Sequence, residues 1–155
     1  MFPGDPDYYD NWVVNGPNSD WIARNAGTPN NGLGTYTRTF DLTGFDLSSV
    51  SIAGSWAIDD IGTLSLNGHE ISSLLAPGPS AWATLTPFSV AAGSPFLNQG
   101  LNTLTITITA SDNSLEGVRL EGALSETTTA VPEPSAMLLA GLGLLGMAPM
   151  VRRQK

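Results

Sequence analysis

The sequence predicts an all-β sandwich or barrel domain that is followed by an apolar transmembrane helix at the C-terminus. Two observations predict the β domain: short segments alternate apolar side chains with Thr or Ser, and Gly, Asn, Pro and Asp separate these segments. No segment before the tail shows a helical period over ten residues. A third observation, an uncharged apolar stretch of 16 residues at 136–151, predicts the helix.

The expected strands follow one another at short intervals along the chain. Residues 103–109 are the clearest case, because Leu104, Ile106 and Ile108 alternate with four Thr. Such alternation is typical of antiparallel strands with one buried face. The other expected strands lie at 36–40, 50–56, 63–66, 69–72, 84–90 and 118–124. Within 84–90, Pro87 indicates an edge strand or a bulge.

The dipeptide Asn67-Gly68 predicts a β-hairpin with a two-residue type I′ turn. Such a turn pairs Leu66 with His69 and Leu64 with Ile71. His69, the one histidine of the chain, then lies at the hairpin tip beside apolar neighbours. We expect a structural or incidental role for it.

We divide the chain into four parts. Residues 1–10 are expected to be a disordered N-terminal segment, and residues 11–125 the sandwich domain. Residues 126–134 form a polar linker that contains Pro-Glu-Pro, and residues 135–155 form the transmembrane helix and a basic tail. About 115 residues suffice for a single core between two sheets.

Charge separates the body of the chain from its tail. The 155 residues carry a net charge of −8, yet residues 1–130 hold 13 acidic and 3 basic side chains. An acidic body argues against nucleic acid as a partner, since phosphate binding needs clustered Lys and Arg. The absence of Cys excludes disulfides, thiolate metal sites and cysteine nucleophiles.

The apolar stretch 136–151 would span roughly 24 Å as a helix, against a hydrocarbon core of roughly 30 Å. Arg152 and Arg153 follow it and can reach the headgroups by snorkelling. The positive-inside rule places this basic end in the cytoplasm and the body outside it.

Pro132-Glu133-Pro134, then the apolar stretch, then Arg152-Arg153 at the chain end resemble the PEP-CTERM sorting signal. This signal occurs in exported proteins of Gram-negative bacteria that make exopolysaccharide. The resemblance implies recognition by an exosortase and cleavage near residues 132–134. The precursor would be anchored in the inner membrane, and the body would then reach the cell surface or the extracellular space.

Export also requires an N-terminal signal peptide. The chain opens with Met1-Phe2-Pro3-Gly4-Asp5, which lacks a basic region and an apolar region. We therefore expect either a start upstream of Met1 or a chain that is a fragment.

Several segments of the body form a recognisable series: Ser19 to Ile22, Gly34 to Leu42, Trp56 to Asp60, Leu66-Asn67-Gly68, Phe96 and Gly100 to Leu104. Together they resemble the galactose-binding-like jelly-roll domains, which include sugar-binding domains attached to glycoside hydrolases. The resemblance covers most of residues 19–124 and implies a jelly-roll β-sandwich.

Aromatic and polar side chains could bind a sugar, because aromatic rings stack on its apolar faces while Asp or Asn bind its hydroxyls. The first candidates are Trp56, Asp59, Asp60 and Asn67, and Trp82 in the loop after Pro77 is another. A competing interpretation is that Trp56 belongs to the core and that Asp59-Asp60 only cap a turn.

We expect no cofactor, and the alternative is a structural calcium ion. Asp59, Asp60 and Asp112 could contribute to a structural calcium site, but no EF-hand loop is present, so the ligands stay unassigned. Catalysis is not expected, because no G-x-S-x-G motif accompanies His69 and nothing selects a pair of carboxylates.

The functional prediction is an exported, non-catalytic protein of the cell surface or extracellular matrix. It would be structural in an exopolysaccharide or biofilm. The alternatives are a carbohydrate-binding module and, third, a fragment of a glycoside hydrolase.

Overall fold

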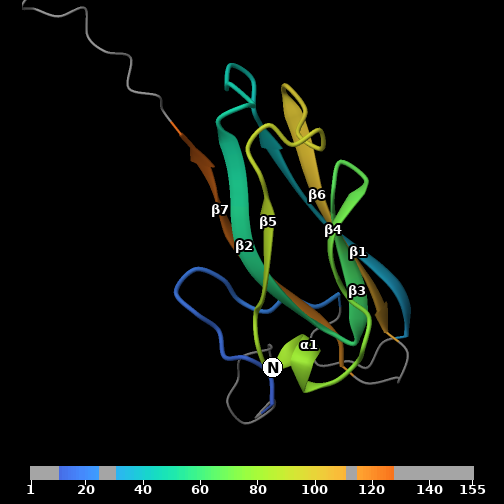
Figure 1. Cartoon of the computed structure of the whole chain (residues 1–155). Coiled ribbons are helices and arrows are strands. Elements are labelled where there is room, and N and C mark those ends of the chain that lie inside the picture. Colours follow the sequence, from blue (N-terminus) through green and yellow to red (C-terminus); the bar gives the residue numbers. More distant parts are fainter. Residues whose placement is uncertain (1–10, 25–30, 111–114, 128–155) are drawn as a thin grey trace, which may run out of the picture.

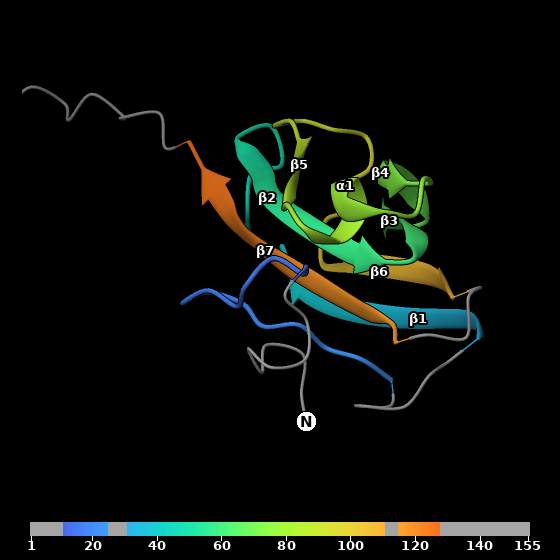
Figure 2. The ribbon, with the colours of Figure 1, turned by 90° about the horizontal axis from the view of Figure 1, so that it is seen from below.

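The structure, a computed structural model, describes residues 11–24, 31–110 and 115–127. Its strands are β1 (Gly32–Asp41), β2 (Val50–Asp59), β3 (Ile61–Leu66), β4 (His69–Leu74), β5 (Thr86–Val90), β6 (Leu101–Ala110) and β7 (Gly117–Glu126), with one short helix, α1 (Pro79–Trp82). The strands form two antiparallel sheets, β1-β6-β3-β4 and β5-β2-β7. Figures 1 and 2 show the sheets packed on each other. The prediction of an all-β sandwich is confirmed.

The core lies between the sheets and follows the period of two that the sequence showed. On β6, Ile106 and Ile108 are buried, while the Thr residues between them face outward. On β2, Val50, Ile52 and Trp56 are buried in the same cluster. Full burial of such a side chain stabilises the fold by roughly 1.5–3 kcal/mol.

The β3–β4 hairpin confirms the predicted turn and corrects the predicted register. Asn67 and Gly68 have φ values of 51° and 84°, as a type I′ turn requires, and Leu66 pairs with His69. The register shifts beyond this pair, so Leu64 pairs with Ser72 and not with Ile71. A β-bulge adds one residue to β4, and the alternation of its side chains therefore changes phase.

The strand at 86–90 confirms the interpretation of Pro87. β5 is an edge strand of the three-stranded sheet, where a residue without an N–H group is tolerated. The short helix α1 was not predicted. It begins at Pro79, whose fixed φ suits the first helical position, and it spans only four residues.

The segment before β1 lies against the outer face of the three-stranded sheet. Trp12 and Trp21 are buried there against Ala57, with their ring centroids 4.3 Å apart. Glycine at position 117 makes room for both rings, because a Cβ there would lie 2.9 Å from Trp12 and 3.1 Å from Trp21. The segment then forms a bridge between Ile22 and Val118 of β7.

Within residues 11–24, 31–110 and 115–127, no helix is long and apolar enough to span a bilayer. The transmembrane helix predicted at 135–155 and the disorder predicted at 1–10 both fall outside these ranges.

Candidate functional site

Trp56 does not offer a platform for a sugar ring, which corrects its place among the candidate ligand-binding residues. Its side chain is completely buried, with 0% exposure, between the two sheets. Its indole Nε1 donates a hydrogen bond of 2.9 Å to the hydroxyl of Ser72. The competing interpretation, in which Trp56 is a core residue, is the one that the structure supports.

The polar residues of the same predicted cluster have structural partners. Asp59 accepts a hydrogen bond of 2.9 Å from the indole of Trp12, and Asp60 is buried. Asn67 donates to the carbonyl of Phe96 and accepts from the backbone N–H of Thr103. These side chains hold turns and segments together, so they do not form one open binding site.

Asn67 belongs to a pair of hydrogen-bonded side-chain amides that sequence inspection did not reveal. Its Nδ2 donates to Oδ1 of Asn102 at 2.8 Å. Asn102 is itself fully buried and donates to the carbonyls of Asn98 and Gly100, both at 2.7 Å. The pair ties the tip of the β3–β4 hairpin to the start of β6. The exposed ring of His69 stacks beside this tip on Phe96, with centroids 4.5 Å apart.

Trp82 is half-buried at the end of α1 and packs against both apolar clusters of the domain. Its carbonyl accepts the backbone N–H of Val13 at 2.8 Å. Its ring therefore helps to fix the N-terminal segment and is only partly open to a ligand.

No group of three His, Cys, Asp or Glu side chains that could hold a metal ion occurs in the part of the chain that the structure describes. Asp112, one of the three aspartates considered for calcium, lies outside that part. The calcium site therefore stays a prediction.

One broad face of the molecule is covered by hydroxyl groups. The outward positions of the four-stranded sheet carry ten Thr or Ser side chains, here called the hydroxyl face: Thr35, Thr37, Thr39, Thr63, Ser65, Ser73, Thr103, Thr105, Thr107 and Thr109. The strand register aligns them in rows across the sheet, the longest being Thr35, Thr107, Thr63 and Ser73. Neighbours within a row are about 4.8 Å apart from strand to strand.

Two charged side chains share the outward side of this sheet with the hydroxyl face. The charged residues on the outward side, Asp41 and Glu70, stand at its margins. The three Thr of β1 are exposed, and those of β6 are half-exposed. The sequence showed the Thr run of 103–109, but only the pairing of four strands brings three further segments beside it.

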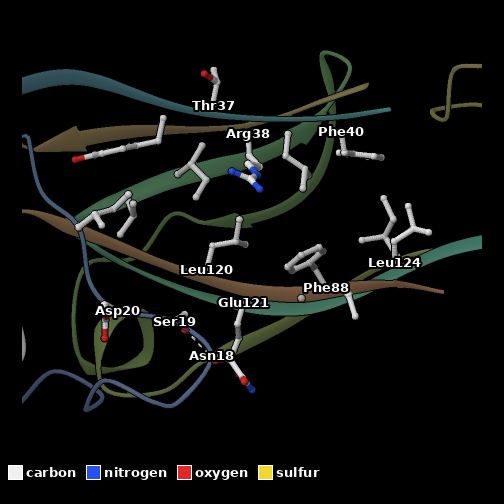
Figure 3. Close-up of a pocket in the computed structure, with 18 residues that line it drawn as sticks. Asn18, Ser19, Asp20, Thr37, Arg38, Phe40, Phe88, Leu120, Glu121 and Leu124 are labelled. Carbon is white, nitrogen blue, oxygen red and sulfur yellow. Dashed lines mark hydrogen bonds between the residues drawn. The ribbon is translucent and has the colours of Figure 1, made fainter. Parts of the chain in front are cut away.

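A groove runs between β1 and β7, where the two sheets open at one side of the sandwich (Figure 3). Its volume is about 630 Å³. The lining is mainly apolar and includes Phe40, Phe88, Leu120 and Leu124. Figure 3 shows Arg38 of β1 directed into the space between the strands.

The side chain of Arg38 is exposed, and no hydrogen bond or ion pair joins its guanidinium group to another described residue. Tyr36 also lines the groove, and its hydroxyl is buried without a hydrogen-bond partner among the described residues. Burial raises the pKa of this phenol, and the nearby negative charge of Glu116 adds to the effect.

Two arginines attach the N-terminal segment beside this groove. The guanidinium of Arg24 forms a bidentate pair with the buried carboxylate of Glu116, at 2.6 and 2.7 Å. This pair raises the pKa of Arg24. Arg119 is buried, and its guanidinium donates to the hydroxyl of Ser19 and to the carbonyl of Val14. Both contacts follow from tertiary structure, since the partners are about a hundred residues apart in sequence.

Comparison with known proteins assigns the C-terminal region. Residues 130–155 match the family model described as the PEP-CTERM protein-sorting motif. The chain therefore carries this sorting motif, as the sequence predicted. The motif implies an exported protein, a membrane-anchored precursor and an exosortase as the partner that processes it.

Solved structures of similar shape are sugar-binding modules by their titles. The C-terminal domain of EclA, a sugar-binding protein, is 12% identical, with 79% of this chain and 88% of that chain covered and a TM-score of 0.42. A family 35 carbohydrate-binding module from an environmental isolate is 13% identical over 75% and 83%, with a TM-score of 0.39. The CBM36-1 domain of a multidomain xylanase from the hindgut metagenome of Trinervitermes trinervoides is 11% identical over 74% and 93%, with a TM-score of 0.32.

These likenesses are too distant to indicate a ligand. A search of curated proteins finds no match to the chain.

Proposed function

We propose that this is an exported, non-catalytic protein of the cell surface or extracellular matrix, whose hydroxyl face lies against a neutral polysaccharide. The sorting motif at 130–155 supports the export and surface part of the proposal. The single observation that supports the molecular role is the set of ten hydroxyl groups in register on one sheet face, whose charged side chains, Asp41 and Glu70, lie at its margins.

A neutral, hydroxyl-rich polymer matches this face in chemistry. Each Thr or Ser hydroxyl can both donate and accept a hydrogen bond, as sugar hydroxyls can. A net contribution of roughly 0.5–1.5 kcal/mol per hydrogen bond makes single contacts weak. Regular spacing over several strands lets many such contacts form along one polymer chain, which suits a structural role in a matrix.

The experiment compares a variant that removes hydroxyls with one that keeps them. Thr37→Val, Thr105→Val and Thr107→Val together remove three hydroxyls and preserve side-chain shape and strand preference. The control changes the same three residues to Ser, which keeps every hydroxyl. Retention of the detergent-solubilised full chain in gels containing neutral polysaccharides is the measurement.

We expect binding to at least one neutral polysaccharide, an affinity at least about tenfold lower for the Val variant, and near-native affinity for the Ser variant. If the native protein bound no neutral polysaccharide, the proposed contact of the hydroxyl face would be wrong, and a structural role without glycan contact would remain. Release of new reducing ends from a polysaccharide would contradict the non-catalytic part and favour the hydrolase alternative. The proposal requires no cofactor.

A further inference from the structure

The open edge of β7 presents backbone groups that another strand can pair with. Val118 exchanges two backbone hydrogen bonds with Ile22, both at 2.9 Å, on the side of β7 that faces away from β2. In an antiparallel strand the N–H and C=O groups of every second residue point to the same side. The backbone N–H and C=O groups of Leu120, Gly122 and Leu124 therefore point to this open side. No strand of the described ranges pairs with them there.

The other three sheet edges carry features that discourage pairing. β5 has only five residues and contains Pro87. β4 has six residues and a β-bulge. β1 is long, but it directs the charged side chain of Arg38 into the groove. β7 has ten residues and neither Pro nor a bulge, and after Val118 its open edge runs for eight residues.

The groove lies beside this same edge. Side chains of β7 that point inward, such as Leu120 and Leu124, form its lining together with Phe40 and Phe88. Leu124 is 39% exposed. The larger sheet has four strands and the smaller one three, with β7 at its edge. A strand added beside β7 would cover the apolar lining with its own inward side chains and would satisfy the free backbone groups.

We propose that the groove binds one extended polypeptide strand, which adds to the three-stranded sheet at β7 and carries an acidic side chain opposite Arg38. This is sheet augmentation, in which main-chain hydrogen bonds give affinity and alternate side chains give specificity. The acidic position follows from Arg38, whose guanidinium has no partner among the described residues and lines a mainly apolar space. Apolar side chains at the remaining inward positions match the lining.

A second copy of the chain is the poorer occupant. Antiparallel pairing of β7 with the β7 of another copy would make both grooves open onto one symmetry axis. It would bring the Arg38 side chains of the two copies into the same opening, and like charges there oppose association. Each copy also carries a net charge of −8.

The probe is a fluorescent seven-residue peptide in which Val and Thr alternate and one of the Val positions is Glu. A matched peptide has Lys in place of that Glu. We expect the full chain to bind the Glu peptide at least tenfold more tightly than the Lys peptide, as measured by fluorescence anisotropy. Arg38→Glu, a change at an exposed side chain, should reverse this preference.

A second pair of variants tests the backbone contact. Leu124→Pro removes an N–H donor from the open edge and leaves the hydrogen bonds with β2 intact, whereas Leu124→Ala shortens the same side chain and keeps the donor. We expect the Pro variant to bind the Glu peptide at least tenfold more weakly than the Ala variant. Circular dichroism and urea unfolding check that both variants are folded.

Three results would overturn the proposal. The first is the absence of peptide binding by the folded native chain, and the second is equal binding by the Leu124→Pro and Leu124→Ala variants. The third is a dimer that is cross-linked through a cysteine at position 123 (Ala123→Cys on β7), while the control Ser89→Cys on β5 stays monomeric. The last result is clear to interpret because the native chain has no Cys, and it would assign the edge to a second copy.

Discussion

The indole Nε1 of Trp56 and the hydroxyl of Ser72 lie 2.9 Å apart in a hydrogen bond between the two sheets. This contact exists because the β-bulge in β4 turns Ser72 inward, opposite Leu64. It satisfies the one polar atom of a side chain that is otherwise wholly buried in the core. A donor left without a partner there would cost free energy.

Ser72→Ala should lower the free energy of unfolding by about 1–3 kcal/mol, because it leaves the buried indole N–H without an acceptor. Ser73→Ala is the matched control. Ser73 lies next in sequence but faces outward opposite Thr63, so we expect a change within about 0.5 kcal/mol. Urea unfolding followed by tryptophan fluorescence measures both. The opposite ranking would show that β4 lacks the bulge.

Arg24→Met should destabilise the domain more than the double variant Arg24→Met, Glu116→Leu. The single variant leaves the carboxylate of Glu116, which is 2% exposed, without its bidentate partner. The double variant removes the buried charge as well. Thermal unfolding of the native chain, both single variants and the double variant completes the cycle. Equal loss in the Arg24→Met and double variants would contradict an ion pair that compensates the buried carboxylate of Glu116.

Acid should weaken the loop of residues 42–49, which joins β1 to β2. The hydroxyl and N–H of Thr43 hold the pKa of Asp41 below its ordinary value of 3.8, and Ser48 does the same for the pKa of Asp46. Because the folded-state pKa is the lower one, each carboxylate stabilises the fold above pH 3.8, and this stability is lost as the pH falls through the folded-state pKa.

The double variant Asp41→Asn, Asp46→Asn should therefore show a smaller loss of melting temperature between pH 5 and pH 2 than the native chain. Each single variant should fall between the two. If the double variant lost as much melting temperature between pH 5 and pH 2 as the native chain, other carboxylates would account for the loss.

Pro132→Ala, or deletion of residues 152–155, should leave an uncleaved precursor in the membrane of the native cell. The Pro-Glu-Pro segment and the basic end both lie in the matched sorting motif. Ser125→Ala, just outside the motif, should be processed normally. Mass spectrometry of the mature protein and cell fractionation are the measurements. An unchanged mature mass and location in the Pro132→Ala and deletion variants would make the tail a plain anchor.

Sequence inspection predicted the hairpin turn, since Asn67-Gly68 acts through local backbone preference. It did not predict the bulge at Ile71, because the inward turn of Ser72 depends on Trp56 in the opposite sheet. The sequence left two interpretations of Trp56 open, a sugar-binding residue or a core residue, and the packing of the two sheets buries it.

The sequence by itself determined the all-β class, the position of most strands and the sorting motif, because these depend on alternation and on residues adjacent in the chain. Only the tertiary structure decided which surfaces can bind. The hydroxyl face forms only when four strands pair in the observed register. The groove forms only where β1 and β7, the edge strands of the two sheets, lie apart. Both arise from contacts between residues far apart in sequence, and alternation within one strand carries no information about its neighbours in the sheet.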